Sequence, residues 1–291
     1  MNKHRIRSAI ALLLLAGFFA GCGAEKETPP QTPSPAAEET NAPDLSGFSA
    51  ELLSTGKSDC AIIYMDGLVI LSDTAEENDY DTISARLKSE GVTRIDYIIL
   101  SHYDKDHIGS AASLIRNYEV GTVLRPDYVE ESGEYYALVK AEEASDTETV
   151  ILGSNYVIRT ENGIITVDPP DEDYGDDNNN SALTTITYRG HTMLFLGDAR
   201  RKRMEEFLRS VPGSCDFIKL PHHGDGNKAL YSLLRSCTPE WAAVTVSEEE
   251  TVEAELVELL DRLGVVLYRT SEGPVRIFWD TDRLITAQDA A

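Results

Sequence analysis

Short apolar runs separated by turn residues open the folded part of the chain. The runs CAIIYM and LVILS flank Asp66 and Gly67, and an Asp-Gly pair between two such runs is typical of a β-hairpin. Apolar residues then recur at helical spacing between residues 79 and 90, and Gly91 ends the predicted helix. The run RIDYIIL predicts a mostly buried strand, and IGSAASLIRNY predicts a helix that begins near the end of that strand.

The second half of the chain repeats this order of elements. Hairpins are predicted with turns near residues 162–163 and 189–190. The helices RRKRMEEFLRSV and KALYSLLRSC lead to the strands DFIKL and EWAAVTVS, and an amphipathic helix over 250–263 precedes the strand-like runs VVLYRT and VRIFWD. Because hairpins open each half and helices then alternate with strands, we predict an α/β fold of two mixed sheets with helices outside them, a four-layer αββα sandwich.

The N-terminus has a different pattern. Basic residues among the first seven positions precede the apolar run Ala9–Ala20, which is shorter than the roughly 20 residues that span a bilayer. This arrangement is typical of a secretory signal peptide. Because Gly21 and Cys22 follow a small residue, residues 1–21 are similar to a bacterial lipoprotein signal, with lipid on Cys22 holding the protein outside the cytoplasmic membrane. An ordinary signal peptide with a chance cysteine is the alternative.

Composition divides the rest of the chain. Residues 22–44 are rich in Pro, Thr, Glu and Ala and nearly lack large apolar side chains, so we predict a disordered tether. Residues 45–291 are long enough for one large domain, and no internal linker or repeat argues for two. The formal net charge of −24 argues against bulk electrostatic binding of nucleic acid, although a local cationic site is compatible with it.

The predicted domain contains three cysteines, Cys60, Cys215 and Cys237. Their spacing matches no zinc-finger pattern, and their odd number leaves at least one thiol outside any disulfide. A disulfide between Cys215 and Cys237 is one possibility, and buried thiols are the favoured one.

The stretch SHYDKDHIGS concentrates four ligand-type side chains at one strand end. His102 and Asp104 follow the predicted strand, and Asp106 and His107 lie at the start of the next helix. A loop between a strand end and a helix can direct several side chains to one point. Imidazole suits zinc, iron and manganese-like ions, and carboxylates shift the preference towards harder ions. The alternative to a metal site is that Asp104 or Asp106 only caps the helix and that the two histidines have no role in binding a metal.

Two further strand ends weaken that alternative. FLGDAR places Asp198 at the end of one apolar strand, and KLPHHGDG places His222 and His223 at the end of another. Ligands of open sheets collect at strand ends. The three segments together therefore predict a metal centre.

These motifs resemble the metallo-β-lactamase superfamily of metal-dependent hydrolases. SHYDKDHIGS is similar to its His-x-His-x-Asp-His motif, with Asp104 in place of the second histidine. Together with STGKSDCAIIY, LSDTA, NNNSALTTITYRGHTMLFLGDA and KLPHHG, this variant resembles the extracellular hydrolase domain of the competence channel protein ComEC. The chain departs from that branch at Ser54, Ser58 and Asp225, and the branch's Tyr-Gly-His-Pro stretch is missing after EWAAVTVS.

The resemblance implies two divalent metal ions, zinc or manganese, held by six residues. These are His102, Asp104, Asp106, His107, Asp198 and one of the pair His222/His223, with His222 favoured. Asp106 is then expected to position the attacking water, and His223 to contact substrate or assist the leaving group. Asp73 is expected to orient the ligand loop by hydrogen bonding. The residues expected to shape the pocket are Asn179, Asn180 and Ser181.

A basic run follows Asp198 directly. Its members, which are candidates to hold a substrate phosphate beside the metals, are Arg200, Arg201, Lys202 and Arg203. The alternative is a solvated first helical turn, where cations oppose the helix dipole.

We therefore predict a metal-dependent hydrolase of phosphodiesterase or nuclease type that acts outside the cytoplasmic membrane. Its expected partner is a small or single-stranded phosphodiester, nucleic acid included, because an acidic surface repels a long polyanion. Hydrolysis of a lactone or thioester at the same site is the alternative activity. A non-catalytic binding lipoprotein is a further alternative, but buried carboxylates and histidines without metal would be costly.

Overall fold

The computed structural model describes residues 47–211 and 213–288. The predicted signal peptide, Cys22 and the predicted tether over 22–44 lie outside the described residues. Within the part of the chain that is described, no helix combines the length and the apolar character that a membrane crossing requires.

Eight of the described strands form the first sheet. Its order is β15 (Arg283–Gln288), β14 (Val275–Asp280), β1 (Phe48–Leu52), β2 (Ala61–Met65), β3 (Leu68–Ser72), β4 (Arg94–Ile99), β5 (Glu119–Pro126) and β6 (Glu148–Leu152). Strands β15 to β3 pair antiparallel, and β3 to β6 pair parallel. The turn between β2 and β3 has positive φ at Asp66 (48°) and Gly67 (89°), as a tight hairpin requires.

Seven of the described strands form the second sheet. Its order is β13 (Val266–Arg269), β12 (Trp241–Val244), β11 (Phe217–Lys219), β10 (His191–Phe195), β9 (Leu183–Tyr188), β8 (Gly163–Asp168) and β7 (Tyr156–Arg159). Strands β7 to β10 pair antiparallel, and β10 to β13 pair parallel. Both sheets thus change from antiparallel hairpins to parallel strands.

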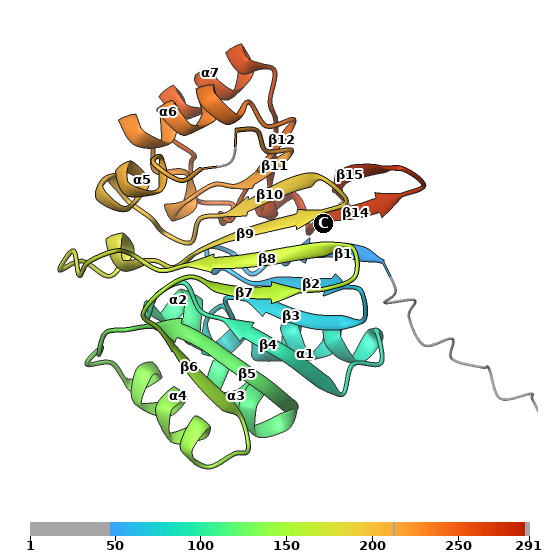
Figure 1. Cartoon of the computed structure of the whole chain (residues 1–291), viewed down its shortest axis with the longest axis vertical. Coiled ribbons are helices and arrows are strands. Elements are labelled where there is room, and N and C mark those ends of the chain that lie inside the picture. The colour runs from blue at the N-terminus through green and yellow to red at the C-terminus, as the bar shows by residue number, and fades with distance from the viewer. Residues whose placement is uncertain (1–46, 212, 289–291) are drawn as a thin grey trace, which may run out of the picture. The chain divides into compact units, whose positions relative to one another are not determined.

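Helices cover the outer faces of the two sheets (Figure 1). The helices beside the first sheet are α1 (Tyr80–Ser89), α2 (Lys105–Ile108), α3 (Ala111–Asn117) and α4 (Gly133–Glu143), and their apolar residues join its outer core. Those beside the second sheet are α5 (Arg201–Phe207), α6 (Lys228–Cys237) and α7 (Ala254–Leu263). A third cluster of apolar side chains lies between the sheets. The predicted four-layer αββα sandwich is therefore confirmed.

Parallel strands bring the predicted site residues to one edge of the sandwich. In the first sheet Ser72 pairs with Ile99, so the segments that follow β3 and β4 leave the sheet side by side. In the second sheet Phe195 pairs with Lys219, so the segments after β10 and β11 do the same. Side chains at the carboxyl ends of neighbouring parallel strands lie close together, and this is where ligands bind in open sheets.

All three cysteines of the described region are buried thiols, and none forms a disulfide. The favoured prediction for Cys60, Cys215 and Cys237 is therefore the one observed. Burial, followed by the charge of Asp73 and Asp59, raises the pKa of the Cys60 thiol well above its usual value. A buried thiol with a raised pKa is an unreactive one.

Candidate metal centre

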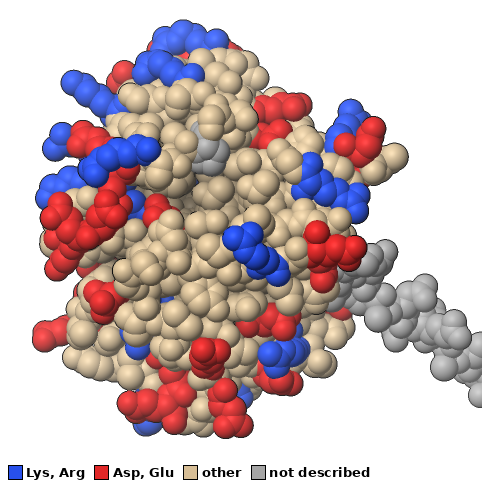
Figure 2. All heavy atoms as spheres, viewed as in Figure 1, with Lys and Arg blue, Asp and Glu red and all other residues tan. Residues whose placement is uncertain are grey.

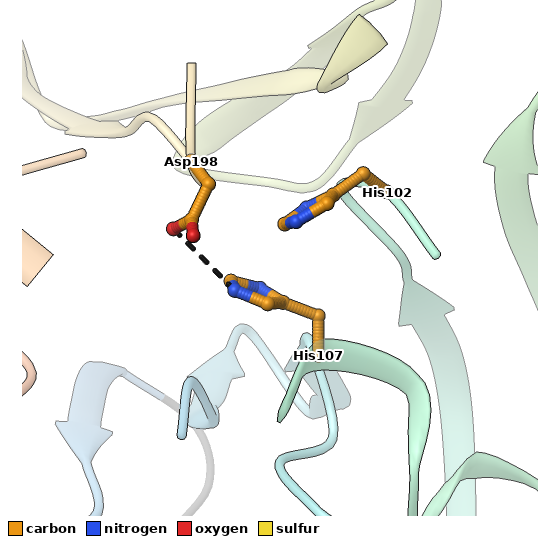
Figure 3. Close-up of side chains that lie close together, drawn as sticks. All are labelled: His102, His107 and Asp198. Atoms are coloured by element: carbon orange, nitrogen blue, oxygen red, sulfur yellow. Dashed lines mark ion pairs between the residues drawn. The ribbon is translucent and has the colours of Figure 1, made fainter. Parts of the chain in front are cut away.

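Two histidines and one aspartate from different layers face one another at this edge (Figure 3). His102 and His107 come from the segment after β4, and Asp198 from the segment after β10. One ligand atom from each lies within 4.8 Å of the other two, and all three side chains are buried. His107 Nε2 lies 3.4 Å from Asp198 Oδ1. Two sheets thus contribute to one cluster of imidazole nitrogens and carboxylate oxygens.

A second cluster shares His107 with the first. Asp106, His107 and His223 also bring one ligand atom each within 4.8 Å of the others. His223 Nε2 lies 3.2 Å from Asp198 Oδ2 and 3.5 Å from Asp106 Oδ2. Asp198 therefore directs one oxygen towards His107 and the other towards His223, which places this carboxylate between the two clusters.

The rings of His102, His107 and His223 direct the same nitrogen towards the centre of the site. In each ring Nδ1 faces an oxygen atom and Nε2 faces the centre. The pairs are His102 Nδ1 with Ser101 Oγ at 3.0 Å, His107 Nδ1 with Asp73 Oδ2 at 2.9 Å, and His223 Nδ1 with the Thr245 carbonyl at 3.1 Å. A histidine whose Nδ1–H donates to oxygen presents the lone pair of Nε2, which is the arrangement found in histidine ligands of metals.

Asp73 holds the ligand loop by hydrogen bonds. Its two carboxylate oxygens accept from the Ser101 amide at 2.7 Å and the Ser101 hydroxyl at 2.8 Å, in addition to His107. Asp73 itself has φ of +57°, an unfavourable backbone conformation of the kind that accumulates at functional sites. Gly197, from the opposite sheet, packs so closely that a Cβ there would lie 2.7 Å from Ser101 Cβ. The loop is therefore fixed from both sheets.

A buried ion pair that was not predicted from the sequence supports the cluster. Lys219, the last residue of β11, pairs with Asp59, and each side chain is only 5% exposed. The Thr245 hydroxyl donates to the other oxygen of Asp59, and Thr245 also accepts from His223. The signal was present in the sequence, because Lys219 stands in a strand whose neighbours are apolar. Only the fold brings Asp59, 160 residues away, beside it.

His223, and not His222, lies within the described clusters. His222 Nδ1 lies 3.0 Å from Asp225 Oδ2, and Arg200 Nη2 donates to His222 Nε2 at 3.2 Å. The residues from His222 to Gly224 all have positive φ, so the backbone turns sharply and sends the two rings in different directions. The sequence pattern predicted His222 as the ligand, whereas His223 is the ring that the fold places among the other predicted ligands.

The outer side of the cluster is open to solvent. The side chain of Asp104 is 44% exposed, and its Oδ2 lies 3.4 Å from His102 Nε2. Asn178, which was not among the predicted site residues, lies beside this pair. With its amide nitrogen turned inward it donates to His102 Nε2 at 3.2 Å and to Asp104 at 3.3 Å, and its oxygen accepts from Arg200 at 3.1 Å.

The three residues expected to shape the pocket have other contacts. Asn179 Oδ1 accepts from the amides of Lys202 and Arg203 at 3.1 and 3.3 Å, so it caps the first turn of α5. Asn180 bonds Asp173 and Tyr174 within its own loop. Ser181 remains at the cluster's edge, with a buried hydroxyl beside Gly197. Asn179 and Asn180 thus stabilise the loop that carries Asn178.

The basic run divides into one site residue and three others. Arg200 contacts His222 and pairs with Asp176 at 3.4 Å, with its side chain 44% exposed. Arg201 pairs with Glu205 on the surface of α5, and the Lys202 ammonium lies 5.7 Å from the centre of the Tyr174 ring.

Arg203 is fully buried and belongs to the core of the fold. Its guanidinium pairs with Asp168 at 2.9 Å and Glu206 at 2.6 Å, and it donates to the Ser181 carbonyl at 2.9 Å. A group paired in this way cannot reach a substrate. The phosphate-binding expectation is thus retained for Arg200 alone, because helical periodicity turns the other basic residues away.

A family model described as "Metallo-beta-lactamase superfamily" matches residues 54–239. The chain belongs to this superfamily. It is 24% identical over 193 residues to the ComE operon protein 3 of Bacillus subtilis (64% of this chain, 25% of that protein). It is 23% identical over 219 residues to the competence protein ComA of Neisseria gonorrhoeae (70% of this chain, 29% of that protein). The chain thus spans little more than a quarter of these relatives.

A solved metallo-β-lactamase fold protein, YhfI from Bacillus subtilis, has the same fold. Its TM-score is 0.54 at 11% identity, over 83% of this chain and all of YhfI. The predicted resemblance to this superfamily and to competence proteins is confirmed, and membership implies divalent metal ions.

The metallo-β-lactamase cluster of this chain fits divalent cations in two respects. His107 Nε2 and His223 Nε2 are buried and have no hydrogen-bond partner, although buried polar atoms are nearly always satisfied. The second respect is charge. The five carboxylates around the rings and the Lys219 ammonium leave four net negative charges, which two divalent cations would balance with the histidines neutral. The carboxylates are Asp59, Asp73, Asp104, Asp106 and Asp198.

In the metal-free chain, protons on His107 and His223 supply the positive charge that the cations would otherwise supply. Burial lowers the pKa of His107, but the charges of Asp198, Asp73 and Asp59 outweigh burial and raise it well above its usual value. Burial likewise opposes the charged form of His223, but the carboxylates of Asp106 and Asp198, 3.5 and 3.2 Å from its Nε2, outweigh burial and raise its pKa to about 9. Burial also opposes ionisation of Asp198, yet the charge of His107 holds its pKa well below normal. The cluster therefore attracts cations strongly.

Proposed function

We propose that this chain is a metal-dependent phosphodiesterase. The observation that carries the proposal is the position of Arg200 beside the His/Asp centre. Its guanidinium reaches the rim through His222 and Asn178, and it is partly exposed. A planar guanidinium is suited to bind two oxygens of a phosphate at once. A neutral lactone or thioester has no such pair of anionic oxygens, so Arg200 favours the phosphodiester.

Buried residues would hold the cations, and a more exposed residue at the rim would orient the attacking water. The buried residues His102, His107 and Asp198, together with His223, would hold the cations, which when bound would supply Lewis acidity and lower the pKa of a water molecule. Asp106, with its side chain 17% exposed, would accept a hydrogen bond from the attacking water and orient it.

The hydrogen bonds behind the rings would keep this arrangement rigid. Asp73 and Thr245 fix the orientation of His107 and His223, and the Lys219–Asp59 pair fixes Thr245. Preorganised groups of this kind stabilise charge that develops in a transition state without reorganising at the moment of reaction.

Surface charge favours a small or single-stranded substrate. On the face shown in Figure 2, acidic atoms gather where the loop after β8 protrudes in Figure 1, with basic atoms next to them near α5. Long polyanions are repelled by an acidic surface. Short phosphodiesters, with Arg200 as the local cation, avoid that repulsion.

We test the activity with the purified full chain loaded with manganese or zinc. The substrates are single-stranded DNA, RNA and a bis-aryl phosphate, and the matched control is Asp106→Asn, which keeps shape but loses the carboxylate. We expect hydrolysis of at least one substrate and a loss of at least 100-fold in Asp106→Asn. If all three substrates stay intact while the same sample hydrolyses a lactone or thioester, that alternative activity replaces the proposal.

The proposed place of action is outside the cytoplasmic membrane, with the chain attached through lipid on Cys22. The support is the pattern of the first 22 residues, in which basic positions, a short apolar run and a small residue precede the cysteine. The name of one relative, a competence protein, is compatible with an envelope location.

A further inference from the structure

A pocket of about 290 Å³ lies beside the metal centre, and its charged lining is mostly acidic. His223 lines it, and the buried Nε2 of that ring has no hydrogen-bond partner. The charged side chains around it are Lys57, Asp225, Glu250 and Glu253. A group bound in this pocket would therefore contact the ring of His223, one of the residues proposed to hold the cations.

The carboxylates of the pocket are held mainly by neutral donors. Glu253 Oε2 accepts from the Gly226 amide at 2.6 Å, and Asp225 pairs with His222 at 3.0 Å. Glu250 Oε2 accepts from the Ser247 amide at 3.2 Å, and Lys57 Nζ is 4.0 Å from Glu250 Oε1. Three carboxylates and one ammonium leave two net negative charges while the histidines are neutral.

This charge is opposite in sign to that of the Arg200 guanidinium on the other rim of the site. The ring of His222 lies between the two: Arg200 contacts its Nε2, and Asp225, which lines the pocket, contacts its Nδ1. A substrate that bridges His222 would thus meet a guanidinium at one end and carboxylates at the other. A second phosphate of a nucleic acid would meet those carboxylates unfavourably, whereas an ammonium group would be attracted by them.

We infer that the substrate is a small zwitterionic phosphodiester, whose phosphoryl group faces the centre and Arg200 and whose ammonium-bearing arm occupies the acidic pocket. This inference rests on the proposed phosphodiesterase activity and narrows its substrate class. The ammonium is a primary one. Quaternary ammonium groups are recognised by the faces of Trp, Tyr and Phe, and the described side chains that line this pocket include none of these three. A primary ammonium instead donates N–H bonds, which carboxylates accept.

The first experiment measures binding without turnover. Isothermal titration compares O-phosphoethanolamine with propyl phosphate, which replaces the ammonium by a methyl group, on the metal-loaded full chain. We expect the amine to bind roughly fivefold more tightly, at the upper end for partly exposed ion pairs, and to lose this advantage at high salt. Equal or weaker binding of the amine overturns the inference.

Matched variants show which residues make the difference. Glu250→Gln and Glu253→Gln keep an oxygen for the Ser247 and Gly226 amides, so each should fold and bring the binding ratio towards one. Glu258→Gln is the control, because Glu258 is exposed on α7 and pairs only with Arg262 in the described structure. If the ratio stays at fivefold in both pocket variants, the acidic pocket is not the source of selectivity.

The second experiment separates this inference from the proposed function. The substrates are 2-aminoethyl 4-nitrophenyl phosphate and propyl 4-nitrophenyl phosphate, which have the same leaving group. The ratio of their kcat/KM values therefore measures the effect of the ammonium-bearing arm alone. Hydrolysis of both esters at equal rates supports the phosphodiesterase and refutes the ammonium pocket. If neither ester reacts, the phosphodiesterase proposal fails, and the binding ratio still decides whether the pocket selects ammonium groups.

Discussion

His223 Nε2 lies 3.2 Å from Asp198 Oδ2, while the neighbouring ring of His222 turns to Asp225 at 3.0 Å. The two rings diverge because consecutive residues with positive φ, 48° and 53°, bend the backbone between them. A left-handed conformation costs a non-glycine residue about 1 kcal/mol or more, so the fold maintains this bend against a local penalty. One histidine thereby reaches the buried centre and the other stays at the rim.

This divergence predicts different effects for the two histidines. His223→Ala should weaken metal binding at least tenfold, because it removes a nitrogen directed at the centre. His222→Ala should retain the full metal content, because that ring contacts Arg200 and Asp225 instead. Elemental analysis of both purified variants after dialysis measures the difference. Equal metal loss in the two variants would contradict the assignment.

The stability of the chain should depend on pH in opposite ways with and without metal. The pKa of His223 is raised from its usual 6.5 to about 9, so in the metal-free fold its stabilising effect is complete below pH 6.5 and is lost as pH rises through 9. Cations require the neutral ring and compete with its proton, so their affinity should rise over the same interval.

The gap in Tm between metal-loaded and metal-free protein should therefore widen from pH 6.5 to pH 9. Differential scanning calorimetry at several pH values, with metal or with a chelator, measures it. A gap that stays constant or narrows would show that protons and cations do not compete for the same rings.

Hydrophobic patterning sufficed to predict the layers but not every element. The predicted helix over 79–90 matches α1, and Gly264 ends α7 with φ of +74° as a C-terminal glycine does. The α7 helix begins only at Ala254, after the acidic residues 248–250 that the prediction had partly included. Strands β5 and β6 and helix α4 were not predicted, because YALVKAEE and neighbouring runs have a weak apolar period. Which sheet a strand joins is a matter of long-range pairing, as for β14 beside β1.

The site was predicted in its parts and not in its geometry. Strand ends and residue types were enough to select His102, His107 and Asp198, which the fold brings together. The choice between His222 and His223 depends on backbone angles that no spacing encodes. Asn178 and the Lys219–Asp59 pair were missed, because their contacts join segments distant in sequence.

The basic run after Asp198 offers a comparison among neighbours. Arg200→Gln should lower kcat/KM for a phosphodiester roughly tenfold, less than an enclosed donor would, because the side chain is 44% exposed. Arg203→Gln should instead lower the free energy of unfolding by about 3–5 kcal/mol, since Asp168 and Glu206 would lose a buried partner. Arg201→Gln should change stability by about 0.5 kcal/mol or less.

Kinetics and urea unfolding of these three variants, side by side, check the assignment. An Arg200→Gln protein with unchanged kcat/KM would remove the observation on which the phosphodiesterase proposal depends. A stable Arg203→Gln protein with impaired kinetics would restore the original expectation for that residue.

Lipid attachment is predicted from the sequence alone. Cys22→Ser should abolish incorporation of labelled fatty acid and should move the protein from the membrane fraction to the soluble one, because a thiol is required for the linkage. Membrane fractionation and fatty-acid labelling in a bacterial host measure both effects. The labelling of Cys22→Ser at the level of the parent chain would contradict the lipoprotein assignment.

Lys219 provides the sharpest test of how the centre is supported. It is the buried cation beneath the cluster, and the charges of Asp59 and Asp198 outweigh burial and raise its pKa, so it is charged at neutral pH. Lys219→Met should lower the free energy of unfolding by about 3–5 kcal/mol, because it leaves the Asp59 carboxylate buried without its partner.

The double variant Lys219→Met with Asp59→Asn should recover part of that loss, since it removes the uncompensated charge and the amide oxygen can still accept from Thr245. Urea unfolding of the metal-free single and double variants measures the recovery. Metal binding provides an independent measure. Because the amide oxygen at position 59 still holds Thr245, which accepts from His223, the double variant should fold and retain the metal content of the parent. A double variant as unstable as Lys219→Met would mean that Lys219 acts by filling space, and the charge of the pair would then have no part in supporting the centre.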